Sequence, residues 1–285
     1  MSASIIPPDT KIGRQLRSAT GCRIVLIAGL PSTGKSLLFQ QLTILADEAG
    51  RTVHTLQWDD ARRDFETEKW LGLYPEHDNL THPGIRKAVG LWVRDGIRKW
   101  DQTHSEAEHL LVIELPVVGG RFIELLRKDD DAIEDLLAST ETCVLVPVPT
   151  NALRQKIEAF RAETFSNPRN EQEKKDAPPY IVHSNWVALR KVYNRWEGLS
   201  DDATRDAGYE EEIVRSVFGR LCRFRNTEFL TIDRVFATTG SAYERPVPVL
   251  KTRATEDDVA AAFARLRKLF PGEAADKAVD GWFDY

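Results

Sequence analysis

The chain has 285 residues, of which 42% are hydrophobic and 29% are charged. This balance is typical of a folded globular protein and excludes a largely disordered chain. No apolar run approaches the roughly 18 residues that a membrane span needs, and the N-terminal residues lack the continuous apolar core of a secretory signal peptide. We therefore expect a cytoplasmic protein without a membrane partner.

Charge and cysteine spacing argue against two further classes of protein. The formal net charge of −5 disfavours broad binding of nucleic acid, because counterion release needs a concentrated basic surface. It leaves room for a local basic patch. Cys22, Cys143 and Cys222 are widely spaced and odd in number, so they predict neither a disulfide framework nor a paired-cysteine zinc site. No pattern indicates the oligomeric state.

Strand and helix patterns alternate from the N-terminus onward. Residues 1–22 form a lead-in that carries a short amphipathic helix at 10–19. The apolar, β-branched run at 24–28 predicts a strand that is buried on both faces of a parallel sheet. A helix from 35 to about 49 and a strand at 52–57 follow, which completes one βαβ unit.

The middle of the chain continues this alternation. A helix is expected to begin near Ala61, and the turn at 81–84 starts a longer helix with an apolar stripe. The apolar runs at 110–115 and 143–148 predict the third and fourth buried strands, and a helix centred on 123–137 separates them. These patterns favour an α/β fold with a mostly parallel, doubly wound sheet.

The last third is predicted to hold a helical insert and the end of the sheet. The insert at about 150–225 contains helices at 152–165, 186–196 and 210–221, with a polar loop at 167–179. Strands are expected at 229–236 and 247–251, followed by a helix that Thr255 caps and that begins with acidic residues. Residues 23–285 are thus expected to form one domain.

One motif decides the class. Residues 29–36, Gly-Leu-Pro-Ser-Thr-Gly-Lys-Ser, match G-x-x-x-x-G-K-[ST] at every position and lie between a predicted strand and a predicted helix. Such a P-loop presents backbone N–H groups and a helix N-terminus to a polyphosphate. Lys35 would span the β- and γ-phosphates, and Ser36 would bind Mg²⁺. The expected nucleotide-binding residues are Gly29, Pro31, Ser32, Thr33, Gly34, Lys35, Ser36 and Leu37.

The fold class then becomes a P-loop NTPase three-layer sandwich, with ATP and Mg²⁺ as the expected cofactors. The third strand has neither the Asp-x-x-Gly of switch GTPases nor the paired acids of many ATPase motors. The second strand instead ends in Asp59 and Asp60, followed by Arg62 and Arg63. An Asp can accept the proton of an attacking hydroxyl, and an Arg can bind an anionic acceptor. Both Asp residues could instead cap the helix that follows.

The order of these motifs resembles that of the P-loop small-molecule kinases, and most of all that of the zeta-toxin-like kinases. Those proteins have a P-loop, an Asp after the second strand, a third strand ending in Ile-Glu with a nearby Gly-Arg, and an Arg-bearing lid helix after a fourth strand ending in Val-Pro. The matching residues are 29–36, Asp59 or Asp60, Ile113 and Glu114, Gly120 and Arg121, Val148 and Pro149, and Arg154 or Arg161. The resemblance covers about residues 23–165.

This resemblance implies a set of residue roles. Asp60 is the preferred base, because strand alternation would send Asp59 to the other side and because Asp60 stands three residues before Arg63. Arg63, Arg62, Glu114 and Arg121 would bind the acceptor. Arg161 or Arg154 would offset charge on the transferred phosphoryl group, although both could simply pair with Glu158 along a solvated helix. Residues 251–254 fall where such kinases have an adenine-contacting loop.

The expected function is ATP-dependent transfer of a phosphoryl group to a hydroxyl of a small, anionic or nucleotide-linked metabolite. Two alternatives stay open. One is a regulatory or assembly ATPase, and the other is a polynucleotide-end kinase that grips phosphates with the basic segment at 154–175. The sequence leaves open the acceptor, the choice between ATP and GTP, and a toxin as against a biosynthetic or resistance role.

Overall fold

The computed structural model describes residues 4–77, 80–166, 178–202, 204, 207–237, 242 and 244–285, apart from the side chains of residues 161 and 164. Most of the expected loop at 167–179 therefore lies outside the described residues. None of the described helices combines the length and the apolar character that a membrane-spanning segment requires. All three cysteines are free thiols.

The described residues form a six-stranded, all-parallel sheet, which confirms the predicted α/β fold. The strands lie in the order β5-β4-β1-β3-β2-β6, and every pairing is parallel. Their bounds are β1 Ile24–Ala28, β2 Thr52–Gln57, β3 His109–Leu115, β4 Thr142–Pro149, β5 Thr227–Ile232 and β6 Leu250–Lys251. Because the strands are parallel, all their carboxyl ends meet at one edge of the sheet, where open α/β sheets bind ligands.

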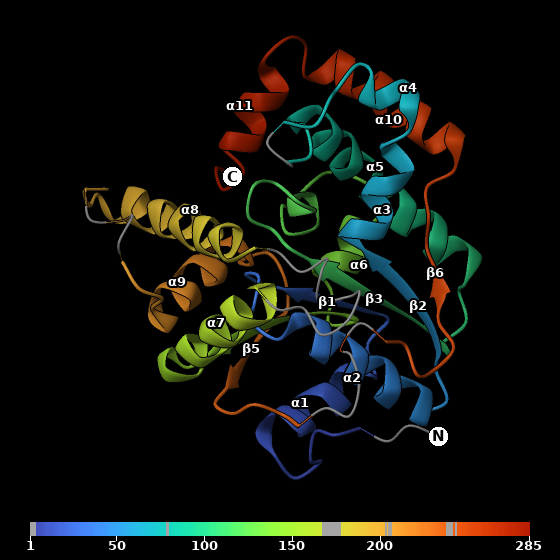
Figure 1. The fold of residues 1–285 in the computed structure, drawn as a ribbon. Coiled ribbons are helices and arrows are strands. Elements are labelled where there is room, and N and C mark those ends of the chain that lie inside the picture. The colour runs from blue at the N-terminus through green and yellow to red at the C-terminus, as the bar shows by residue number, and fades with distance from the viewer. Residues whose placement is uncertain are drawn as a thin grey trace.

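Helices cover both faces of the sheet (Figure 1). The side chains of β1 show why: Val25 and Ile27 pack in one apolar cluster with α1 and α2, while Ile24, Leu26 and Ala28 pack in the other cluster with α5 and α10. The helices are α1 Lys11–Ala19, α2 Lys35–Glu48, α3 Trp58–Phe65, α4 Glu68–Leu71, α5 Pro83–Thr103, α6 Glu134–Ala138, α7 Asn151–Ser166, α8 Pro179–Glu197, α9 Glu211–Leu221, α10 Glu256–Leu269 and α11 Ala274–Asp280.

The structure corrects several expected bounds. The single helix expected at 123–137 is wrong: a short 3₁₀ helix, Ile123–Leu125, and α6 replace it. The reason lies between them, where Asp129 and Asp131 accept hydrogen bonds from the backbone N–H groups of Asp130 and Ile133 and so compete with helical bonding. The last two strands are shorter than expected, and α3 begins at Trp58 rather than near Ala61.

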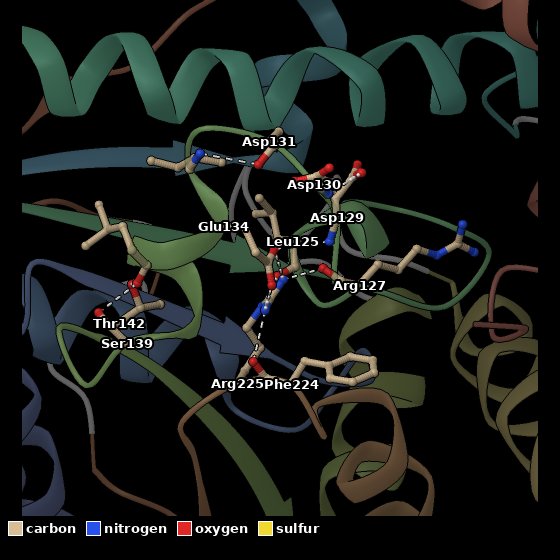
Figure 2. A network of polar contacts seen from close by, with 12 residues as sticks. Leu125, Arg127, Asp129, Asp130, Asp131, Glu134, Ser139, Thr142, Phe224 and Arg225 are labelled. Carbon is tan, nitrogen blue, oxygen red and sulfur yellow. Dashed lines mark hydrogen bonds and ion pairs between the residues drawn. The ribbon is translucent and has the colours of Figure 1, made fainter.

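A buried polar network holds this interrupted segment in place (Figure 2). Glu134 receives hydrogen bonds from Arg94 of α5 (2.8 Å) and from Arg225 just before β5 (2.8 and 3.1 Å). Arg94 also forms a two-pronged ion pair with Asp131. Burial would raise the pKa of Glu134, but the hydrogen bonds from Arg225 and Arg94 outweigh burial and lower it. The network ties α5 and α6 to the start of β5.

Candidate active site

The P-loop joins the carboxyl end of β1 to the first turn of α2. Its backbone depends on unusual conformations: Ser32 and Gly34 have φ of 61° and 88°, and Gly34 serves as the N-cap of α2. The N–H of Gly29 donates to the Leu115 carbonyl at the end of β3 (3.2 Å). A Cβ at Gly29 would lie only 3.3 Å from the Thr33 hydroxyl. Glycine at this position thus lets the loop close tightly on itself.

Lys35 lies buried inside this loop. Its side chain is 7% exposed, and its ammonium donates to the Leu30 carbonyl at 2.8 Å. The Thr33 hydroxyl donates to the same carbonyl (2.9 Å). The Lys35 ammonium also lies 4.0 Å from the carboxylate of Glu114, which follows Ile113 on the neighbouring strand β3. A buried ammonium therefore stands beside a carboxylate at the edge where ligands are expected.

The loop fits the phosphates of a nucleotide. Among the described side chains, the Ser32 hydroxyl is buried and has no hydrogen-bond partner, and a Cβ built at Gly34 meets nothing within 4 Å. An unpaired hydroxyl beside open space, at the positive end of a 14-residue helix, suits an anion. Ser36 and Leu37 follow in the first helical turn and are half-buried. The described residues hold no group of three or more His, Cys, Asp or Glu suited to a metal, so Mg²⁺ at Ser36 would depend on nucleotide oxygens.

Asp59 and Asp60 lie in the first turn of α3, so the strand alternation expected for them is wrong. Successive helical residues point about 100° apart rather than to opposite faces. The Asp59 side chain is 75% exposed and pairs with Arg62 (3.1 Å), whereas that of Asp60 is 21% exposed and pairs with Lys251 of β6 (2.9 Å). Neither caps the helix, because the N-cap is Gln57 and no side-chain cap bond forms.

Arg62 and Arg63 lie on the same helix but in different surroundings. Arg62 pairs with Glu66 (2.6 Å) as well as with Asp59. Burial alone would lower its pKa, but these two carboxylates outweigh burial and raise it. Arg63 is exposed to solvent. Arg62 is therefore held in ion pairs, while Arg63 can reach outward.

Arg121 stands at the end of a tight hairpin at 117–121. Gly119 and Gly120, with φ of 75° and 79°, form the turn, and the backbones of Val117 and Arg121 pair across it. The Arg121 guanidinium donates to the Val118 carbonyl (2.9 Å) and to the Asn185 side chain of α8 (2.6 Å). Burial, with the nearby charge of Arg86, lowers the pKa of Arg121 to about 10. The charges of Asp59 and Glu114 oppose this shift but do not outweigh burial.

Arg86, in the first turn of α5, is a residue that the sequence analysis missed. Its guanidinium donates to the Thr81 carbonyl (2.8 Å), and burial lowers its pKa. Within the described part of the chain, no carboxylate lies within 4.0 Å of the guanidinium of Arg86 or Arg121. Arg86 and Gly119 also line a hollow of about 410 Å³ between α8 and α11. Two partly buried cations without a carboxylate in contact favour an anion from outside.

Of the two arginines expected in a lid helix, Arg154 and Arg161, the structure describes the side chain of Arg154. Arg154 is fully buried: its guanidinium donates to the Pro31 carbonyl of the P-loop (2.6 Å) and to Glu158 (2.6 Å), and it lies 5.2 Å from the Tyr209 ring. The expected pair with Glu158 therefore forms together with a contact to the P-loop. The side chain of Arg161 lies outside the described residues, as does much of the basic segment at 154–175.

The adenine-contacting loop expected at 251–254 is misplaced. β6 pairs with β2 at the far edge of the sheet, so β3 and β2 separate it from the strand that carries the P-loop. There Lys251 pairs with Asp60 and Arg253 pairs with Asp64, both on α3. This segment therefore braces α3 rather than the nucleotide side of the P-loop.

The structure also brings Gln57 and Arg245 to the site. The side-chain amide of Gln57 donates through Nε2 to the Glu114 carboxylate (3.0 Å). The Arg245 guanidinium donates to the side-chain oxygen Oε1 of Gln57 (3.3 Å). The parallel register of β2 and β3 sets Gln57 directly beside Glu114. No local sequence pattern marks these two residues. The register of β2 and β3 places Gln57 beside Glu114, and Arg245 comes from a segment 188 residues further along the chain.

Comparisons with known proteins add no relative. No protein-family model matches the chain, no curated protein matches it, and no solved structure matches it.

Proposed function

We propose that this protein is an ATP- and Mg²⁺-dependent phosphotransferase, similar to P-loop small-molecule kinases, that phosphorylates a hydroxyl of a small, anionic or nucleotide-linked metabolite. The observation that carries the proposal is the buried Lys35 ammonium inside the P-loop, 4.0 Å from Glu114. A loop with this shape binds phosphates through its amides, its lysine and the positive end of its helix.

On the donor side, residues 29–37 bind the phosphates and Ser36 binds the metal ion. Bound Mg²⁺–ATP would supply the phosphoryl group together with the positive charge of the metal. Arg154 supports this role from behind, because its contact with the Pro31 carbonyl holds α7 against the loop. Arg161 remains the candidate for a lid residue that closes over the phosphates and excludes water.

On the acceptor side, Arg121 and Arg86 favour a molecule that carries a phosphate or carboxylate group. Their guanidiniums lack a carboxylate partner within 4.0 Å among the described residues, and bidentate binding of an anion would satisfy them. Glu114 and the outward-facing Arg63 can contact the same molecule, and Arg62 can join them by exchanging its pair with Asp59. The hollow beside Arg86, about 410 Å³, falls in the range of small-ligand sites.

The surroundings of the two Asp residues favour Asp59 as the base. Its charge acts on Arg121, as does that of Glu114, whereas Asp60 is paired with Lys251 toward the edge of the sheet. As the acceptor oxygen forms its bond to the γ-phosphorus and the bond to the leaving ADP oxygen breaks, the hydroxyl proton passes to the Asp59 carboxylate.

Phosphorus NMR on mixtures of protein, ATP, Mg²⁺ and candidate acceptors tests this function. The panel contains sugar phosphates, nucleosides and nucleotide sugars. We expect a new phosphomonoester together with ADP for one of these classes, and no product with Lys35→Ala. Asp59→Asn should lower kcat by about a hundredfold, whereas Asp47→Asn, a matched change at the exposed far end of α2, should leave kcat unchanged.

Two results would count against this account. ADP release without any phosphorylated acceptor would favour a regulatory or assembly ATPase. A larger loss of kcat with Asp60→Asn than with Asp59→Asn would return the base to Asp60.

A further inference from the structure

We propose that Gln57 and Arg245 are positioning residues. They hold the Glu114 carboxylate beside the P-loop, with one of its oxygens turned toward the Lys35 ammonium. This inference rests on the proposed function, which it deepens by adding two residues to the catalytic apparatus. Neither belongs to the P-loop or to the acidic and basic residues that follow β2.

Four side chains form a continuous chain of contacts. Arg245 donates to Oε1 of Gln57 (3.3 Å), and Nε2 of Gln57 donates to Oε2 of Glu114 (3.0 Å). The other carboxylate oxygen of Glu114 lies 4.0 Å from the Lys35 ammonium. One oxygen of Glu114 is thus fixed from behind, while the other faces the group that would contact the phosphates.

The chemistry of this chain permits only one orientation of the Gln57 amide. A guanidinium can only donate hydrogen bonds, and an ionised carboxylate can only accept them. The amide between them must therefore turn its oxygen toward Arg245 and its NH₂ toward Glu114. Without Arg245, the amide could rotate and set its oxygen against the carboxylate, which would push Glu114 away from its place.

Contacts with the sheet hold Gln57 in place, and contacts with α2 hold the segment that carries Arg245. Gln57 is the last residue of β2 and is in register with Glu114 of β3. Arg245 lies between β5 and β6 in the chain, and it and its neighbour Glu244 contact α2. The Gln40 side chain of α2 donates to the Glu244 carbonyl (2.9 Å), and the Arg245 guanidinium lies 4.8 Å from the Phe39 ring. A chain segment far from the P-loop in sequence is thereby anchored on the P-loop helix.

Steady-state ADP release from ATP with Mg²⁺, in the presence of the acceptor that the wild type phosphorylates, provides the assay, and calorimetry gives the affinity for ATP. We expect Gln57→Leu and Arg245→Ala each to lower kcat by about tenfold, the effect of one lost positioning hydrogen bond, with little change in ATP affinity. Because Arg245 acts through Gln57, the double variant should be no slower than Gln57→Leu alone. Arg245→Lys, which keeps a donor, should recover most of the rate.

Gln57→Glu distinguishes positioning from simple packing. It keeps the size of the side chain and can still accept from Arg245, but it sets a second carboxylate against Glu114. We therefore expect a larger loss of kcat than with Gln57→Leu. Gln102→Leu, on the exposed surface of α5, is the matched control, and urea midpoints verify that each variant is folded.

The outcomes separate the two claims. If the wild type phosphorylates an acceptor and the two single variants match its rate, or if their losses multiply to about a hundredfold in the double variant, the positioning role is overturned and the proposed function stands. If the folded wild type phosphorylates no acceptor of the panel, the proposed function fails and the positioning role fails with it.

Discussion

At the scale of single residues, the site contains two arginines, Arg86 and Arg121, that contact no carboxylate among the described residues. Arg121 is held by a carbonyl and an amide rather than by a carboxylate, so its lowered pKa reflects a cost of burial that nearby carboxylates do not offset. An anionic ligand would offset that cost. A buried guanidinium of this kind does not stabilise the fold by itself, because an uncharged side chain would avoid the cost of burial.

Near the amino ends of the strands, the fold disfavours the charged form of a buried histidine, His54. His54 of β2 is 3% exposed, and its Nε2 lies 3.0 Å from Nδ1 of His109. Burial, followed by the charges of His104, His109 and Arg23, lowers the pKa of His54 from 6.5 to about 4. The folded protein therefore keeps His54 neutral at a pH where the unfolded chain already binds a proton.

This shift predicts a loss of stability in acid. The contribution is fully present above pH 6.5, and it is lost as the pH falls from 6.5 to about 4. The loss should reach about 3 kcal/mol, since each pKa unit is worth about 1.4 kcal/mol. Urea unfolding across this range should show a shallower loss for His54→Asn than for the wild type or for His183→Asn, an exposed control on α8. Identical pH profiles for all three proteins would refute the assignment.

At the scale of elements, the buried network around Glu134 joins helices that no regular hydrogen bonding connects. Glu134 lies between two guanidiniums, of which Arg225 is fully buried in its side chain. Because the network links α5, α6 and the start of β5, it supports the same sheet that carries the site. Removing this network should therefore lower the free energy of unfolding of the whole domain rather than disturb one local segment.

Glu134→Gln should lower the free energy of unfolding by about 3 kcal/mol, because it leaves the buried guanidiniums short of one negative charge. Asp135→Asn, a matched change at the next and exposed residue of α6, should change it by less than about 0.5 kcal/mol. Denaturant unfolding at pH 7 measures both. Equal stabilities for the two variants would show that the network does not stabilise the fold.

Elements defined by contiguous residues could be predicted from the sequence, and those defined by distant contacts could not. The β-branched runs of β1 and β2 needed no tertiary information and their bounds are confirmed, and α2 begins at Lys35 as expected. The helix expected at 123–137 failed because Asp side chains that bond to the backbone overrode the apolar pattern. In the site, Gln57, Arg86 and Arg245 escaped notice because sheet register and chain crossings bring them into place.

At the scale of the whole molecule, the parallel sheet explains why these residues meet. β1, β3 and β2 are neighbours and end at one edge, so the P-loop, Glu114 and the first turn of α3 are set side by side. Arg245, which lies between β5 and β6 in the chain, adds a contact to Gln57. The fold thus brings polar groups from several distant segments to the carboxyl edge of the sheet.

Calorimetric titration of the folded protein with ATP in the presence of Mg²⁺ measures the nucleotide binding on which the proposed function depends. We expect saturable binding to one site per chain, weakened at least about tenfold in Lys35→Ala by the loss of a charged contact to phosphate. Binding should be unchanged in Lys268→Ala, which removes an exposed lysine from α10. If the folded wild-type protein binds neither ATP nor GTP, the proposed function is refuted.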